Sequence, residues 1–416
     1  MYPSVPESLS GLGGWLGIAA WPQAQAIDCR AQAEPSVRVP SAEAEMLRQP
    51  SRHIGFDPEI LKLLCKPRLH LIANRQTDII ASMAVNQVPS TTTPPAVPPA
   101  GVWCPAVTCF TDNDELDLAA QSKYFAHLSR SGLAGLVVMG TNSEAMLLTR
   151  EERSQLIATA RQAVGPKFPL MAGVGAHSTK QTLQLAEDAA AAGADYLLVL
   201  PPAYFGKATT MATVRRFFAR VAAEAALPVV IYNFPGVCNG VDMDSDTMTA
   251  IVRDSARANG GRSRVVGVKL TCGSVGKITR LAAQHRPEDF AVFGGQSDFL
   301  IGGLAAGSAG CIAAFANVCP RLTAEIYSLY VGGERQRAME LQRLAALAES
   351  PCKSGIAATK FAATLFSARL AGIEDPEAKF RPRHPYEEPS EAAKDAVREA
   401  LKEAGEMEYM LQKSSV

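Results

Sequence analysis

The sequence lacks the cysteine and histidine patterns that are typical of disulfide frameworks and metal sites. Its nine cysteines are scattered without a Cys-x-x-Cys pair, and its six histidines include no His-x-x-x-His pair. An odd number of scattered cysteines predicts reduced thiols. A zinc-dependent mechanism would lack its usual ligands. We therefore predict no metal, no cofactor and a cytoplasmic location.

An excess of charge of one sign is also missing. Lysine and arginine together number 41, and so do aspartate and glutamate. This balance gives no reason to expect a nucleic-acid or anionic-membrane partner. Residues 8–27 are uncharged, but their glycines, glutamines and proline make a poor signal peptide and a worse membrane span. We expect a small-molecule ligand.

The chain divides by composition into three parts. Residues 1 to about 82 show no sustained hydrophobic period, and the proline- and threonine-rich stretch at 88–99 cannot build a core. We predict a poorly ordered extension and linker over 1–100, a barrel over 101–320, and a C-terminal helical segment over 321–416 that packs on the barrel.

Eight short apolar runs follow the linker, and their brevity and β-branched content are typical of buried parallel strands. The runs are 102–110, 135–140, 169–175, 196–202, 228–235, 265–271, 290–295 and 310–317. Helical patterns separate them: Thr149 with Glu152 forms a capping box before a helix that closes at Gly165, and Ser178 with Gln181 repeats the pattern before a helix that runs to Gly193. This repeat predicts an α/β fold, a (β/α)8 TIM barrel followed by C-terminal helices.

The C-terminal segment carries two helical patterns. The first pattern places Met339, Leu344 and Leu347 on one apolar stripe. The second pattern spans about 390–405 and places Val397 and Leu401 on another apolar stripe. We expect both stripes to pack on the barrel or on a neighbouring subunit, and we assign them no chemistry.

Lys269 ends the sixth apolar run, and active sites of such barrels lie at the carboxyl ends of the strands. A lysine there must reach solvent, pair with a carboxylate or remain neutral. A neutral amine can attack a keto group and form a Schiff base. Taken alone, the position is more typical of a solvated strand end.

Three other runs end in groups that could share a site with this lysine. The second ends in Gly140-Thr141-Asn142-Ser143-Glu144, the fourth in Pro201-Pro202-Ala203-Tyr204, and the fifth in Tyr232-Asn233-Phe234-Pro235. With Gly267-Val268-Lys269, these motifs make the chain from about Val102 to the low 380s resemble the pyruvate-dependent class I aldolases grouped with dihydrodipicolinate synthase and N-acetylneuraminate lyase.

The resemblance implies roles for several residues. Lys269 would form an imine with pyruvate, or with a longer 2-oxo acid that is cleaved to pyruvate. Tyr232 would move protons near the imine, with Thr141 and Tyr204 as relay partners. The family tyrosine that matches Tyr204 contacts the site of an adjoining subunit, which implies a homo-oligomer, a dimer or a tetramer.

The remaining positions concern substrate binding. The turn of Thr141 and Asn142, just ahead of a helix, would hold the substrate carboxylate. Ile312 matches a position whose backbone carbonyl faces the lysine, and Gly294 with Gly295 would keep the mouth of the barrel open.

Two differences between this sequence and the motifs of dihydrodipicolinate synthases indicate which reaction to expect. Family members that condense pyruvate with aspartate semialdehyde carry an arginine after the Tyr-Asn-x-Pro motif, but residues 235–240 contain no basic residue here. Asn142 and the segments around Tyr232 and Lys269 look most like 4-hydroxy-2-oxoglutarate aldolase and fungal 2-keto-3-deoxy-L-galactonate aldolases. We expect cleavage of a 2-oxo acid to pyruvate and a hydroxylated aldehyde, with dihydrodipicolinate synthesis as the alternative. Ser143 replaces a loop glycine and would be strained if that position needs a positive φ.

Other function classes fit less well. Gly273 to Ile278 resembles a phosphate-binding loop, but its glycine spacing is wrong and Ile278 replaces the required hydroxyl. Gly173-Val174-Gly175 lacks the third glycine of a dinucleotide fingerprint. A non-catalytic barrel that binds a 2-oxo acid is a third alternative. The joint presence of Lys269, Tyr232 and Thr141 favours an enzyme.

Overall fold

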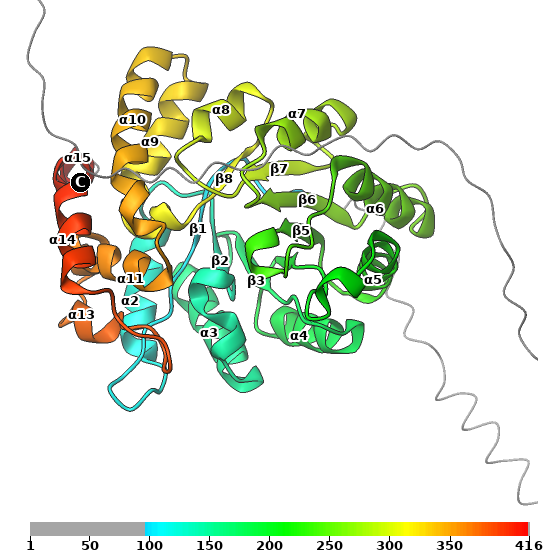
Figure 1. Ribbon diagram of the computed structural model, residues 1–416, viewed down its shortest axis with the longest axis horizontal. Helices are drawn as coiled ribbons and strands as arrows, with labels where there is room; N and C mark the ends of the chain where they lie inside the picture. The colour runs from blue at the N-terminus through cyan, green and yellow to red at the C-terminus, as the bar shows by residue number, and fades with distance from the viewer. Residues whose placement is uncertain (1–95, 415–416) are drawn as a thin grey trace, which may run out of the picture. The chain divides into compact units, whose positions relative to one another are not determined.

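The structure, a computed structural model, describes residues 96–414. Its centre is a closed barrel of eight parallel strands in the order β1 to β8 (Figure 1). The strands are β1 Gly101–Pro105, β2 Gly135–Val138, β3 Leu170–Gly173, β4 Tyr196–Val199, β5 Val229–Asn233, β6 Val265–Leu270, β7 Ala291–Gly294 and β8 Gly310–Ile312. The predicted TIM barrel is confirmed. The division into three parts stays a prediction, and most of its first part lies outside the described residues.

Helices connect consecutive strands and surround the barrel (Figure 1). The connecting helices are α2 Leu118–Ser129, α3 Arg150–Val164, α4 Thr179–Ala191, α5 Met211–Glu224, α6 Ser245–Ala258, α7 Val275–Gln284 and α8 Leu300–Ala305, and α9 Pro320–Val331 follows the last strand. Short 3-10 helices follow several strands: η2 Thr141–Ser143, η3 Ala145–Leu147, η4 Gly206–Ala208, η5 Pro235–Val237 and η6 Ala314–Asn317.

Local capping explains where two of these helices begin. Thr149 and Glu152 form the predicted capping box at the start of α3, and Gly165 follows its end with φ 78°. Ser178 accepts a hydrogen bond from the Gln181 backbone amide at the start of α4. That helix ends at Ala191, slightly before Gly193, which has φ 97°. A left-handed residue just beyond the last turn is a common way to end a helix.

Alternating side chains of the strands fill the inside of the barrel. The inward set includes Trp103, Val137, Met171, Tyr196, Leu198, Val230, Tyr232, Val266, Ala291, Phe293 and Ile312. A Cβ at Gly135 would lie 2.4 Å from the Trp103 ring, so only glycine leaves room for this indole. Because the interior is a packed core, a ligand must bind at the rim.

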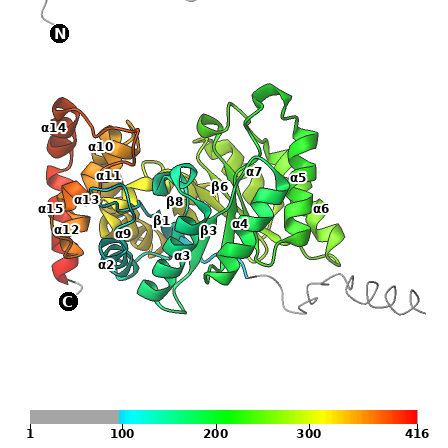
Figure 2. The same ribbon diagram turned by 90° about the horizontal axis from the view of Figure 1, so that it is seen from below.

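The C-terminal helices lie on one side of the barrel, beside α2 and α9 (Figure 2). They are α10 Arg335–Cys352, α11 Ile356–Leu365, α12 Ser367–Leu370, α13 Pro376–Lys379, α14 Glu391–Ala400 and α15 Lys402–Ser414. Within residues 96–414, no helix is both long and apolar enough to cross a lipid bilayer.

The two predicted C-terminal stripes differ in outcome. Val397 and Leu401 are buried, whereas Met339 and Leu347 of α10 are 36% and 74% exposed within this chain. The buried face of α10 instead consists mostly of small residues, including Ala338. Leu341 is buried on this face and Leu344 packs against the core, so only part of the predicted stripe lies outside the contact.

Candidate active site

Lys269 and Tyr232 are direct neighbours on adjacent strands. They form a register pair between β5 and β6, beyond a register shift at Val229 and Val230, and the side chain of Tyr232 belongs to the inward-facing set. Lys269 is 2% exposed, and its Nζ lies 4.3 Å from the centroid of the Tyr232 ring. No carboxylate pairs with Lys269 among the described residues. Lys269 thus has neither of the contacts that would make it an ordinary strand-end lysine.

Thr141 completes this group. It begins η2, directly after β2, and its Oγ1 lies 3.2 Å from the Tyr232 hydroxyl, where either oxygen can donate. Tyr232 therefore contacts both neighbours, Thr141 through its hydroxyl and Lys269 through its ring. Hydroxyl groups at hydrogen-bond distance can pass a proton to one another.

The turn after β2 is held by hydrogen bonds to the segment that follows β1. Ser143 is buried, its Oγ donates to the Ala106 carbonyl at 2.6 Å, and its own carbonyl accepts from Thr108 Oγ1 at 2.8 Å. The positive φ of this turn, 56°, belongs to Glu144 and not to Ser143. The condition under which Ser143 would be strained is therefore not met.

The predicted helix start at this turn also differs. Thr141 lies in a three-residue 3-10 helix, and η3 after it has three residues as well. Such short helices have little macrodipole. The amides of Thr141 and Asn142 have no acceptor inside η2, since the first N–H groups of a helix lack internal partners. Any carboxylate held here would depend on these individual donors.

A cavity of about 630 Å³ opens at this rim. Thr141 and Tyr232 line it, whereas Lys269, whose Nζ lies over the Tyr232 ring, does not. Strand ends and the loops after them supply most of the wall. The C-terminal part of the chain supplies the rest, with Gly355, Ile356, Ala357, Pro382, Tyr386 and Glu387.

The other predicted site residues do not line this cavity. Tyr204 is 70% exposed, and its ring contacts those of His177 and Phe205. Ile312 is buried in the barrel interior, and a Cβ at Gly294 would lie 2.9 Å from the Phe299 ring. Asn142 is half-buried in the turn beside Thr141. The roles of these four residues stay predictions.

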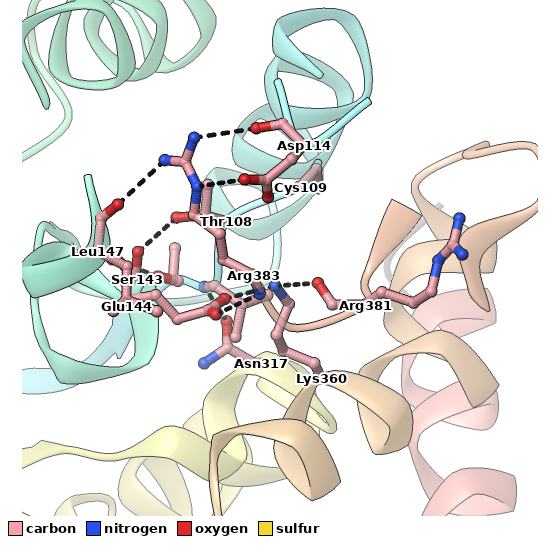
Figure 3. A network of polar contacts seen from close by, with 12 residues as sticks. Thr108, Cys109, Asp114, Ser143, Glu144, Leu147, Asn317, Lys360, Arg381 and Arg383 are labelled. Atoms are coloured by element: carbon pink, nitrogen blue, oxygen red, sulfur yellow. Dashed lines mark hydrogen bonds and ion pairs between the residues drawn. The ribbon is translucent and has the colours of Figure 1, made fainter. Parts of the chain in front are cut away.

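A second buried lysine was missed. Lys360 of α11 is fully buried, and its Nζ lies 2.5 Å from Glu144 Oε1 and 2.7 Å from the Arg381 carbonyl (Figure 3). Burial lowers the pKa of Lys360, and the Glu144 carboxylate opposes this shift. The sequence carried the same signal as at Lys269, because Lys360 is the one charged residue in the apolar helix Ile356–Leu365.

The surroundings of Lys269 are buried. Burial raises the pKa of the Cys104 thiol and that of Cys311, while the positive charge of Lys269 acts in the opposite direction on both. Cys104 and Cys311 are free thiols on β1 and β8. Both remain protonated at neutral pH. In the described part of the chain, no group of three or more histidine, cysteine or acidic residues could hold a metal ion.

Comparison with known proteins identifies the family. The model of the dihydrodipicolinate synthetase family matches residues 98–404. This chain belongs to that family. A crystal structure of a Coccidioides immitis protein, provisionally placed in the dihydrodipicolinate synthase family, is 61% identical with a TM-score of 0.70, and covers 76% of this chain and 98% of that one. The structural match therefore extends over nearly the whole length of that relative.

Named relatives point to aldolases. A Coccidioides immitis protein, provisionally named a mitochondrial 4-hydroxy-2-oxoglutarate aldolase, is 65% identical over 76% of this chain and 98% of its own. An Emericella nidulans protein with the same provisional name is 40% identical over 76% of this chain and 98% of its own. The L-threo-3-deoxy-hexylosonate aldolase of Hypocrea jecorina is 34% identical over 76% of this chain and 99% of its own.

The predicted cytoplasmic location is contradicted by these names, since both 4-hydroxy-2-oxoglutarate aldolase relatives are named as mitochondrial. The prediction depended on reduced cysteines. Free thiols argue against an oxidising compartment such as the secretory pathway, but they do not distinguish the cytosol from the mitochondrial matrix.

Proposed function

We propose that this protein is a class I aldolase, a carbon–carbon lyase that cleaves a 2-oxo acid to pyruvate and an aldehyde through an imine on Lys269. The observation that carries this proposal is the placement of Lys269 against Tyr232, with Thr141 Oγ1 3.2 Å from the tyrosine hydroxyl. Its family membership and the aldolase names of its relatives support the same conclusion.

The reaction begins when the Lys269 amine attacks the C2 keto carbon of the substrate. Loss of water gives an iminium ion, which draws electrons from the adjacent bonds. A base removes the proton of the C4 hydroxyl, the C3–C4 bond breaks, and its electron pair moves toward the iminium nitrogen. The products of this step are an aldehyde and an enamine on Lys269.

Tyr232 is placed to move the protons of these steps. Its oxygen can accept the C4 hydroxyl proton as its own proton passes to Thr141 Oγ1, which in turn releases its hydroxyl proton to water in the cavity. Protonation of the enamine at C3 restores an iminium ion, and water then hydrolyses it to release pyruvate and the free lysine. The carbon and proton counts balance without a metal or redox partner.

Synthesis of dihydrodipicolinate is less well supported. The aspartate semialdehyde of that reaction carries a second carboxylate, which needs a charge-matched partner when it is buried. Among the described residues that line the cavity, none is lysine, arginine or histidine.

Borohydride reduction in the presence of pyruvate tests the proposal. Reduction converts the imine into a stable secondary amine, so peptide mapping should find pyruvate on Lys269. The K269R variant should take up no pyruvate and should lose turnover of both 2-keto-3-deoxy sugar acids and 4-hydroxy-2-oxoglutarate. An unmodified wild-type protein, or full activity in K269R, contradicts the mechanism.

We also propose that the chain works as a homo-oligomer. Tyr204 and its neighbour Phe205 are 70% and 75% exposed, so two adjacent aromatic rings remain available to another subunit. Oligomeric state is not uniform among similar structures, because one of them, 28% identical with a TM-score of 0.65, is described as a monomeric dihydrodipicolinate synthase variant. Sedimentation of the purified protein tests this, and an active monomer would contradict it.

A further inference from the structure

The loop between α13 and α14 forms part of the cavity wall. Pro382, Tyr386 and Glu387 of this loop line the same cavity as Thr141 and Tyr232. Residues from the end of the chain therefore face the substrate space, although the barrel supplies Lys269. They lie beyond the strand ends, where the aldehyde half of a substrate that is bound to Lys269 would extend.

This wall is fixed to the barrel by a buried polar cluster (Figure 3). The Arg383 backbone amide donates to Glu144 Oε2 at 2.8 Å. The Arg383 side chain donates through Nη1 to the Leu147 carbonyl at 3.2 Å and to Glu152 at 2.7 Å. Lys360 joins the Arg381 carbonyl to Glu144. The loop backbone is therefore held against the turn that carries Thr141, and the exposed side chains of Tyr386 and Glu387 reach the cavity from it.

The charges of this cavity have one sign. Its charged lining residues are Glu144 and Glu387, and no basic residue lines it among those described. Lys360 compensates Glu144 at 2.5 Å. Glu387 has no ion pair or hydrogen bond within the described part of the chain, whereas its neighbour Glu388 pairs with Lys394 at 2.9 Å. Glu387 is thus an uncompensated negative charge at the cavity.

We propose that Glu387 is a specificity-determining residue, which selects a substrate whose aldehyde half is uncharged and hydroxylated. This inference rests on the proposed aldolase function. A carboxylate accepts hydrogen bonds from hydroxyl groups and repels a second carboxylate. A 2-keto-3-deoxy sugar acid releases a neutral hydroxyaldehyde, whereas 4-hydroxy-2-oxoglutarate releases an aldehyde that carries a carboxylate. Glu387 favours the first of these substrates.

Charge reversal at two adjacent positions tests the proposal. We would measure kcat/KM of wild type, E387R and E388R with 2-keto-3-deoxy-L-galactonate and with 4-hydroxy-2-oxoglutarate. E387R should change the ratio of the two values by about tenfold toward 4-hydroxy-2-oxoglutarate, which corresponds to about 1.4 kcal/mol. E388R makes the same change in net charge one residue away, at a side chain that does not line the cavity, and should leave the ratio within about twofold.

The E387Q variant separates charge from hydrogen bonding. Glutamine keeps an acceptor oxygen but removes the negative charge, so the ratio should shift in the same direction as in E387R and by less. Equal shifts in E387R and E388R, or no shift in E387R, would overturn the proposal.

Borohydride trapping of pyruvate on wild type, E387R and E388R separates the test of Glu387 from the test of the aldolase mechanism. Normal trapping with an unchanged substrate ratio rejects the role of Glu387 and leaves the aldolase mechanism standing. Absence of trapping in wild type rejects both. Reduced kcat/KM for both substrates by the same factor in E387R would indicate a structural effect, and it counts against a role in specificity.

Discussion

At the residue scale, Tyr232 connects the two parts of the site. Its ring lies against Lys269 Nζ, and its hydroxyl lies beside Thr141 Oγ1. The ring and the hydroxyl can be separated by substitution, because phenylalanine keeps the packing inside the barrel and removes only the oxygen. Proton transfer by a positioned side chain contributes about 10²- to 10⁴-fold to the rate of a reaction.

We therefore expect Y232F to lower kcat for cleavage by at least about 100-fold while the protein keeps its fold. Pyruvate should still be trapped on Lys269 by borohydride, although more slowly. Steady-state kinetics and peptide mapping give the two readouts. Y196F is the matched control, since the Tyr196 hydroxyl donates to the Val97 carbonyl, at the start of β4 and away from the cavity. A similar loss of kcat in both variants would contradict a role for the Tyr232 hydroxyl in proton transfer.

Strand periodicity explains which site residues could be predicted from the sequence. Lys269 and Tyr232 lie at inward positions near the ends of adjacent parallel strands, so their meeting follows from the barrel topology. Asn233, one residue later, points the other way, donates to Asp242 and accepts from the Met243 amide. Tyr204 lies in a loop, where no period fixes the direction of a side chain. Its exposure could not be read from the sequence.

At the scale of elements, the pair of Glu144 and Lys360 joins the turn after β2 to α11. Both side chains are at most 2% exposed, and 216 residues separate them along the chain. No local pattern predicts such a contact, which is why the C-terminal wall of the cavity was missed. A single lysine in an apolar helix indicates that Lys360 needs a carboxylate partner, but the sequence does not identify that partner as Glu144.

Loss of one member of this pair should strongly destabilise the protein. In K360M the Glu144 carboxylate would stay buried without its cation, which typically costs about 3–5 kcal/mol. Urea denaturation measures the free energy of unfolding. K353M serves as a control, because Lys353 pairs with Asp298 where both side chains are about one-third exposed, and such pairs contribute about 0–1 kcal/mol. K360M combined with E144Q should recover part of the loss, and equal stability of K360M and wild type would contradict the assigned contact.

At the scale of the whole molecule, the C-terminal helices are attached to the barrel through a buried carboxylate. Glu408 of α15 accepts from the backbone amides of Arg321 and Leu322, at 3.1 Å and 2.8 Å, at the start of α9. The Arg321 guanidinium lies 3.7 Å from the same side chain. These donors lower the pKa of Glu408, but burial is the larger effect and raises the pKa to about 7. The attachment of α15 to the barrel is thus sensitive to pH.

A raised pKa in the folded state makes stability fall as the pH rises. Between the unfolded value of 4.5 and about 7, the folded protein retains a proton on Glu408 that the unfolded chain has lost. The contribution of Glu408 to the free energy of unfolding is fully present below pH 4.5, and it is lost as the pH rises through about 7. Between pH 5 and pH 8 this single group should reduce the free energy of unfolding by about 2 kcal/mol.

Urea denaturation of wild type and E408Q at both pH values measures the effect, because glutamine keeps an acceptor for the α9 amides but does not titrate. E406Q alters an exposed carboxylate on the same helix and should retain the wild-type pH dependence. If E408Q and wild type lose the same stability over this interval, Glu408 is not the group responsible.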